Sequence, residues 1–73
     1  MKFLTKQSYK VTGFEDSCPQ SYMQKLLSLG FVPNAHFYIE KKALFGNPYH
    51  IILKHFSVTL RQSELDYIKV EAL

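Results

Sequence analysis

Cysteine, tryptophan and long hydrophobic runs are scarce or absent in this sequence. Cys18 is the single cysteine, so no intramolecular disulfide can form. No apolar run exceeds three residues, as in Ile51 to Leu53, whereas a membrane-spanning helix needs about 20. The first eight residues lack the apolar stretch of about 7 to 15 residues that a secretory signal contains. We therefore expect a protein that is not membrane-embedded and that resides in the reducing cytoplasm.

Charge of one sign is not concentrated in any part of the chain. Nine lysine or arginine residues stand against six aspartate or glutamate residues, for a formal net charge of +3. The lysines are spread along the sequence, and Arg61 is the single arginine, which leaves few side chains for two-point contacts to bases. We therefore expect no nucleic acid partner and interpret the lysines as solvated surface residues.

The length and the aromatic content predict one small domain. Seventy-three residues, 47% hydrophobic and 15% aromatic, suffice for a single core and leave no room for a second domain. Residues 1–8 are short and polar, and we expect them to be a flexible lead-in. Residues 9–73 are expected to be the single folded domain.

A helix is predicted over residues 19–29. Pro19 suits the first helical position, because its ring fixes φ and its missing N–H would have had no partner there. Three apolar residues are spaced to form one stripe along the helix: Met23, Leu26 and Leu27. Gly30 is placed to end the helix in the left-handed conformation, and Phe31 is then expected to fold back over Leu26.

Five short strands are predicted from alternating apolar and polar residues. They cover residues 9–14, 36–40, 49–54, 57–60 and 68–70. The second and third are expected to form a hairpin around a turn at residues 46–48, and a helical turn with Ser63 and Asp66 at cap spacing precedes the last. This pattern predicts a mainly β domain with one to two short helices, folded as an SH3-like small β-barrel. An OB-fold competes, but it usually needs longer strands.

Four segments of the chain resemble the FeoA family. Residues 24–33 are similar to its helix-to-strand signature, Leu-x-x-Leu-Gly-(Met/Leu/Phe)-x-Pro-Gly. Residues 44–51 look like its Leu-Gly-Asp-Pro turn, residues 58–65 like its Leu-Arg segment, and residues 68–70 like its closing strand. The resemblance therefore extends over most of the predicted domain.

Two asparagines depart from the family pattern without removing either turn. Asn34 stands where the family usually has glycine and Asn47 where it often has aspartate, and asparagine tolerates left-handed backbone better than most residues. The resemblance implies an SH3-like barrel and a cytoplasmic accessory role in bacterial ferrous iron uptake. It implies that the domain acts by protein–protein interaction with the membrane GTPase transporter FeoB. It implies no catalytic residue, because the family has no agreed ones.

Spacing indicates neither a metal site nor a catalytic site. The sequence has no Cys-x-x-Cys, His-x-x-x-His or His-x-His pattern. His36 and His55 are weak metal candidates, but alternation along the predicted hairpin places His36 outward and His55 inward. No motif combines a nucleophile, a base and an oxyanion hole. We expect no metal, no cofactor and no enzymatic activity; a metal-sensing SH3-like module that binds Fe(II) or another divalent transition metal stays open as the alternative.

Apolar side chains in or beside turns are expected to form a docking surface for a partner. Five such residues stand out: Phe31, Val32, Tyr38, Phe45 and Phe56. We expect the loop after the helix and the turn before the third strand to make the contact. The predicted contact residues are Leu29, Gly30, Phe31, Val32, Pro33, Phe45, Gly46, Asn47 and Pro48. Exposed barrel edges leave self-association open.

Overall fold

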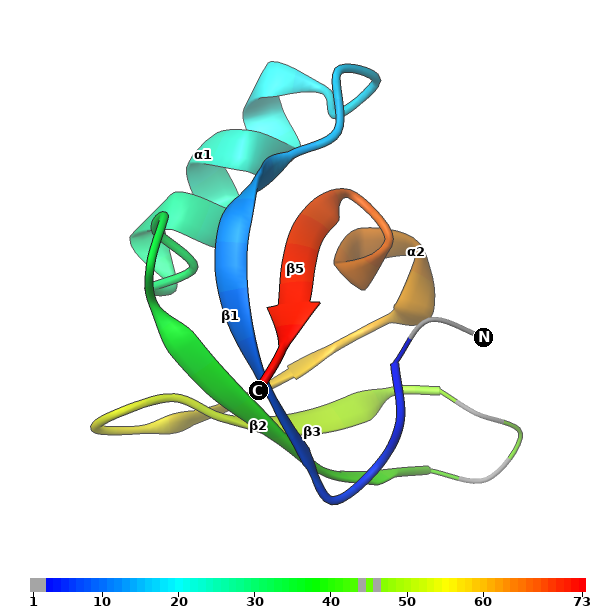
Figure 1. The fold of residues 1–73 in the computed structure, drawn as a ribbon. Helices are drawn as coiled ribbons and strands as arrows, with labels where there is room; N and C mark the ends of the chain where they lie inside the picture. The colour runs from blue at the N-terminus through cyan, green and yellow to red at the C-terminus, as the bar shows by residue number, and fades with distance from the viewer. Residues whose placement is uncertain (1–2, 44, 46) are drawn as a thin grey trace.

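The structure, a computed structural model, describes residues 3–43, 45 and 47–73. Its five strands form one antiparallel sheet in the order β4-β3-β2-β1-β5. The strands are β1 (Gln7–Phe14), β2 (His36–Lys42), β3 (Tyr49–Ile52), β4 (Ser57–Leu60) and β5 (Ile68–Ala72). Figure 1 shows the sheet curled, with α1 (Gln20–Ser28) beside β1 and α2 (Gln62–Leu65) beside β5.

Two irregularities in strand pairing accompany the curl of the sheet. The register of β1 against β5 shifts between Val11 and Gly13, and that of β2 against β3 shifts between Ile39 and Lys41. Such bulges bend a strand and increase its twist, which lets a short sheet close toward a barrel. The predicted mainly β, SH3-like small barrel with two short helices is confirmed.

The core is built from alternate residues of the central strands together with aromatic rings. Tyr9 and Phe37 lie directly opposite each other in β1 and β2, with ring centroids 5.7 Å apart. Phe3 is fully buried and packs edge-on against Tyr9 at 5.3 Å. The remaining buried hydrophobic residues of the cluster are Val11, Leu26, Phe31, Ile39, Tyr49, Ile51, Leu53, Leu60, Leu65 and Ile68.

The folded part begins earlier than the predicted boundary at residue 9. Phe3 belongs to the core, the Lys6 N–H donates to the Ile39 carbonyl, and β1 starts at Gln7. The prediction of a flexible lead-in rests on its being short and mostly polar. A single aromatic side chain in a small core is nevertheless enough to hold a chain end against the sheet.

The helix α1 lies within the predicted range and ends in the predicted glycine cap. Gly30 has φ of 108°, its N–H donates to the Leu27 carbonyl, and the Phe31 N–H donates to the Leu26 carbonyl. These two bonds make a Schellman motif. The predicted apolar stripe is wrong in one member, since Leu26 is buried but Leu27 is 37% exposed. Neighbouring residues of an α-helix project about 100° apart. A short helix that packs against the barrel along one narrow face can therefore bury Leu26 and leave Leu27 exposed.

The cap of α2 differs from the predicted one. The N-cap residue is Arg61, not Ser63, and the Glu64 carboxylate accepts the Arg61 N–H at 3.1 Å. Ser63 lies inside the helix, so its spacing to Asp66 was coincidental. The same three-residue spacing joins Arg61 to Glu64, where only the acidic half of a capping box can operate because arginine has no acceptor.

Candidate functional site

Two connections that are far apart in the sequence meet on one side of the barrel. Residues 29–35 link α1 to β2, and residues 53–56 form the turn between β3 and β4. Figure 1 shows both connections on its left-hand side. A β-carbon placed on Gly30 would lie 3.6 Å from the Phe56 ring and 3.8 Å from Leu53, so the two connections lie close together.

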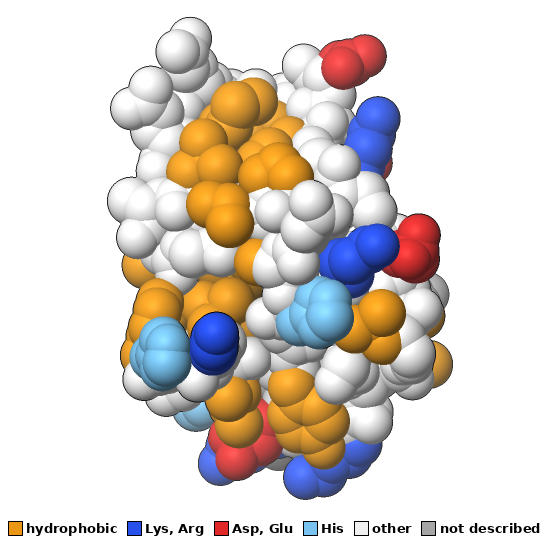
Figure 2. Space-filling model, turned by 60° about the vertical axis from the view of Figure 1, so that its left-hand side comes forward, with side chains coloured by type: hydrophobic (Ala, Val, Ile, Leu, Met, Phe, Trp, Pro, Cys, Tyr) orange, Lys and Arg blue, Asp and Glu red, His pale blue; other side chains and the backbone are white. Residues whose placement is uncertain are grey.

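An open hollow of about 460 Å³ lies between these connections and is called the apolar hollow below. Its apolar lining residues are Gly30, Ala35, Leu53 and Phe56, and its polar ones are Asn34, His36, Lys54 and His55. Phe56 is 48% exposed, and Val32, in the same connection as Gly30, is 44% exposed. Figure 2 shows this side of the molecule, where histidine side chains lie beside groups of hydrophobic ones.

The structure separates the predicted contact residues after the helix into three kinds, exposed, partly buried and fully buried. Val32 and Pro33 are exposed, and Leu29 and Gly30 are partly buried. Phe31 was expected at the contact, but it is fully buried and packs edge-on against Phe37 at 5.3 Å. The Schellman motif turns Phe31 back under the helix end, so its side chain is part of the core.

The second predicted contact segment lies elsewhere on the molecule. Figure 1 shows the β2–β3 connection on the right-hand side, away from residues 29–35. Phe45 is fully exposed there, and the Asn47 Oδ1 accepts the Gln62 N–H at 2.8 Å. Gly46, also predicted at the contact, lies outside the described residues. The two predicted segments therefore do not combine into one surface.

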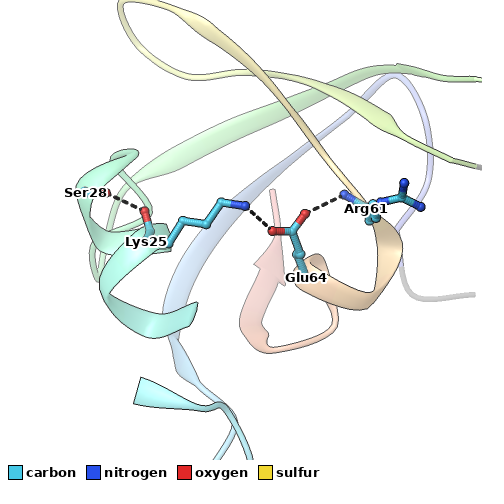
Figure 3. Close-up of polar contacts among 4 residues, drawn as sticks. All are labelled: Lys25, Ser28, Arg61 and Glu64. Atoms are coloured by element: carbon cyan, nitrogen blue, oxygen red, sulfur yellow. Dashed lines mark hydrogen bonds and ion pairs between the residues drawn. The ribbon is translucent and has the colours of Figure 1, made fainter. Parts of the chain in front are cut away.

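A second open hollow, of about 340 Å³, lies beside the β2–β3 connection and is called the polar hollow below. It is lined by Asn47, Pro48, Thr59, Arg61 and Glu64. The Glu64 carboxylate is 2.6 Å from the Lys25 Nζ, and this ion pair joins α2 to α1 (Figure 3). Burial would raise the pKa of Glu64, but bonds from Lys25 and the Arg61 N–H outweigh it and hold the pKa below its ordinary value.

The two weak metal candidates lie on the same side of the molecule, which alternation along the hairpin did not predict. His36 and His55 are both exposed, and both line the apolar hollow. The inward orientation expected for His55 is wrong, because β3 ends at Ile52 and strand alternation does not continue through the turn. Within residues 3–43, 45 and 47–73, no group of three or more His, Cys, Asp or Glu side chains could hold a metal ion.

Leu53 and Lys54 line the apolar hollow but are not among the contact residues predicted from the sequence. They were read as the end of the third strand, and the turn they begin has no glycine or proline to mark it. Phe56 was singled out as an apolar residue beside a turn but was not included among the contact residues. Its position beside Gly30 is the observation that joins this turn to the helix connection.

These features define a small SH3-like barrel with an open, partly apolar hollow between two of its loops. None of the helices within the described ranges is long and apolar enough to cross a membrane. The chain belongs to the FeoA domain family, which it matches over residues 3–72. This family of accessory domains is associated with ferrous iron transport and is generally non-enzymatic. The predicted family is confirmed.

Solved structures of FeoA proteins have the same fold. A FeoA-like protein from Clostridium acetobutylicum is 33% identical, with a TM-score of 0.87 over 99% of this chain and 81% of that one. Iron(II) transport protein A from Clostridium thermocellum is 28% identical, with a TM-score of 0.84 over 99% of this chain and 43% of that one. A zinc-complexed FeoA from Stenotrophomonas maltophilia, described as a prokaryotic SH3 domain protein, is 22% identical. Its TM-score of 0.80, over 94% of this chain and 84% of that one, supports the fold alone.

Proposed function

We propose that this domain is a cytoplasmic accessory protein of bacterial ferrous iron uptake that binds the cytoplasmic region of a FeoB-type GTPase transporter. Membership of the FeoA family supports the link to iron transport. The observation that carries the binding role is the apolar hollow, formed where the residues 29–35 connection meets the residues 53–56 turn.

The exposed apolar side chains beside this hollow favour a contact surface. Phe56 and Val32 are each nearly half exposed, whereas Phe3, Phe31 and Phe37 are almost completely buried in the core. Fully burying an exposed Phe or Val side chain contributes roughly 1.5 to 3 kcal/mol, and covering the half that is exposed here would contribute about half of that. Two such residues around a concave surface match the usual pattern, in which a few apolar anchors dominate a protein interface.

The remaining predicted contacts belong to the same proposal at a second place. Phe45, Asn47 and Pro48 belong to the β2–β3 connection, at the opposite end of that hairpin, and a large transporter domain could reach both ends of a molecule whose longest extent is 28 Å. The apolar hollow supplies the primary contact in this proposal. Phe45 supplies a secondary one.

Binding would regulate the transporter by population shift. A domain that binds one nucleotide state of the GTPase more tightly than another moves the equilibrium toward that state by the difference in binding free energy. This mode of action needs no catalytic residue on the accessory domain.

The test is a binding titration of the purified domain against the isolated cytoplasmic region of its cognate FeoB, with GDP, with a GTP analogue and without nucleotide. We expect saturable binding that depends on the nucleotide. Phe56→Ala and Val32→Asp should weaken it, while Leu4→Asp, at an exposed apolar residue outside the hollow, should not. Binding that is absent in every state would refute the proposal.

A divalent metal sensor is the second candidate, favoured by the two histidines that line one hollow. His36 and His55 could supply two imidazole ligands, and the other positions would have to come from water or a partner. Stoichiometric Fe(II) binding that is lost in both His36→Ala and His55→Ala would support this function. Equal binding by the variants and the wild type would reject it.

A further inference from the structure

The polar residues of the apolar hollow share one electrostatic property. They are an amide (Asn34), two imidazoles (His36 and His55) and an ammonium group (Lys54). Asparagine is neutral, lysine is a cation, and histidine is neutral or cationic but never an anion. No carboxylate lines the hollow among the residues that the structure describes.

The carboxylates of the described residues are engaged or located elsewhere. Two ion pairs form among the residues that the structure describes: Lys10 with Glu71 at 3.4 Å and Lys25 with Glu64 at 2.6 Å. Neither pair includes a residue of the hollow. Lys54 is exposed, and no acidic side chain among the described residues forms an ion pair with its ammonium group.

We infer that the apolar hollow receives a partner segment in which an apolar side chain is flanked by carboxylates. The inference rests on the proposed function, because it specifies which part of the partner occupies the site. The apolar side chain would pack against Leu53, Phe56 and the Gly30 backbone, and the carboxylates would face Lys54 and the histidines. A basic segment would place like charges together, which opposes binding.

Charge at the rim of an interface mainly accelerates encounter and excludes wrong partners, and its effect is screened by salt. Binding should therefore weaken with ionic strength, and Lys54 should account for much of that dependence. The net charge of +3 adds a weaker attraction spread over the whole molecule.

The matched control is Lys41, which is also exposed but lies on β2 away from the hollow. It lies five positions along the strand from His36, a distance of about 17 Å. Lys54→Glu and Lys41→Glu change the net charge equally, so a difference between them reports position. Both are surface changes that should keep the fold, which circular dichroism would verify.

The first experiment measures the Kd of each variant for the cognate FeoB cytoplasmic region at low and at high salt. Lys54→Glu should raise the Kd about tenfold at low salt and less at high salt, whereas Lys41→Glu should change it no more than about twofold. Wild-type affinity in Lys54→Glu, or equal weakening in both variants, would overturn the inference while leaving the proposed function intact.

The second experiment does not depend on FeoB. Nitrogen-15 chemical shifts of the domain are followed with a short peptide of leucines flanked by glutamates at millimolar concentration, and with matched peptides carrying lysines for the glutamates or serines for the leucines. The acidic leucine peptide should shift residues 30 and 53–56, and the other two should not. Equal shifts with the lysine peptide, or no shifts around the hollow, would overturn the inference. Selective shifts without FeoB binding would support the inference and refute the proposed partner.

Discussion

The apolar hollow and the polar hollow lie at different ends of one small barrel and use their side chains differently. In the polar hollow, Asn47 accepts a hydrogen bond from the α2 backbone, and Glu64 accepts from both the Arg61 N–H and Lys25. In the apolar hollow, Lys54 and Phe56 are exposed and form no ion pair or ring contact among the described residues.

This difference separates stabilising residues from those available to a partner. In the polar hollow, Asn47 and Glu64 already accept hydrogen bonds from within the fold, and the bond from Lys25 to Glu64 holds α1 to α2. The apolar hollow leaves apolar area and positive charge without an internal role. Substitutions at the polar end should therefore change the stability of the domain, and those around the apolar hollow should change binding.

The largest expected effect tests the border between core and contact surface. Phe31→Ala removes a fully buried ring, and we expect it to lower the free energy of unfolding by about 3 to 5 kcal/mol. Val32→Ala, one residue further and 44% exposed, should cost no more than about 0.5 kcal/mol. Urea unfolding followed by circular dichroism measures both. Similar values for the two variants would show that the border is misplaced.

The next largest effect concerns the backbone that shapes the apolar hollow. Gly30 has a backbone φ of 108°, which residues other than glycine adopt only with strain. Gly30→Ala should therefore lower the free energy of unfolding by roughly 1 to 2 kcal/mol. The new methyl group would meet Phe56 at ordinary contact distance, so the cost comes from the backbone and not from a clash. Thermal unfolding tests this, with Gly13→Ala as the control, since Gly13 has open space around it. An unchanged midpoint in Gly30→Ala would contradict the strain.

Acid sensitivity should come from the polar end. The folded-state pKa of Glu64 lies below its unfolded value of about 4.3, so its stabilisation is present above that pH and is lost as the pH falls through the lowered pKa. Lys25→Met removes the ion pair, raises the pKa of Glu64 and should flatten this pH dependence. Because Lys25 is half exposed, the cost at pH 7 should be only about 0.5 to 1 kcal/mol.

Urea unfolding of the wild type and Lys25→Met at pH 7 and in acid measures this change. Lys10→Met, which removes the more exposed pair with Glu71, is the control and should change the pH dependence less. An equally steep loss of stability in Lys25→Met and the wild type would show that Glu64 is not the responsible group.

The smallest effect on stability is expected at the β2–β3 connection. Phe45 is fully exposed, so Phe45→Ser should change the free energy of unfolding by less than about 0.5 kcal/mol. Its effect on FeoB binding should be smaller than that of Phe56→Ala if the apolar hollow is the primary contact. A larger loss of binding in Phe45→Ser would reverse the ranking of the two ends.

Local patterns in the sequence were sufficient for the elements and the family. The strand at residues 57–60 was predicted with the bounds that the structure has, and the helix differs by one residue at each end. Gly30 predicted the Schellman motif, because a left-handed cap after an apolar helix is decided within a few residues. Residues 24–33 and the later segments carried enough of the family pattern to identify it.

The candidate site was only half predictable, because local patterns in the sequence report on near neighbours and not on which loops meet in space. Val32 and Gly30 were named from the helix connection, but Leu53 and Lys54 were assigned to a strand, and Phe31 was assigned to the surface. Strand alternation states which face a residue occupies while the strand lasts. It says nothing about a turn, nor about which turn a curled sheet places beside it.

By itself, then, the sequence determined a small mainly β domain of the FeoA family, with a glycine-capped helix and five short strands, since helix caps and two-residue alternation depend on near neighbours. The tertiary structure alone decided that Phe31 and Phe3 belong to the core, that residues 29–33 lie apart from Phe45 and residues 47–48, and that the residues 53–56 turn completes the apolar hollow. These outcomes depend on bulges and sheet curl, which bring together residues more than twenty positions apart.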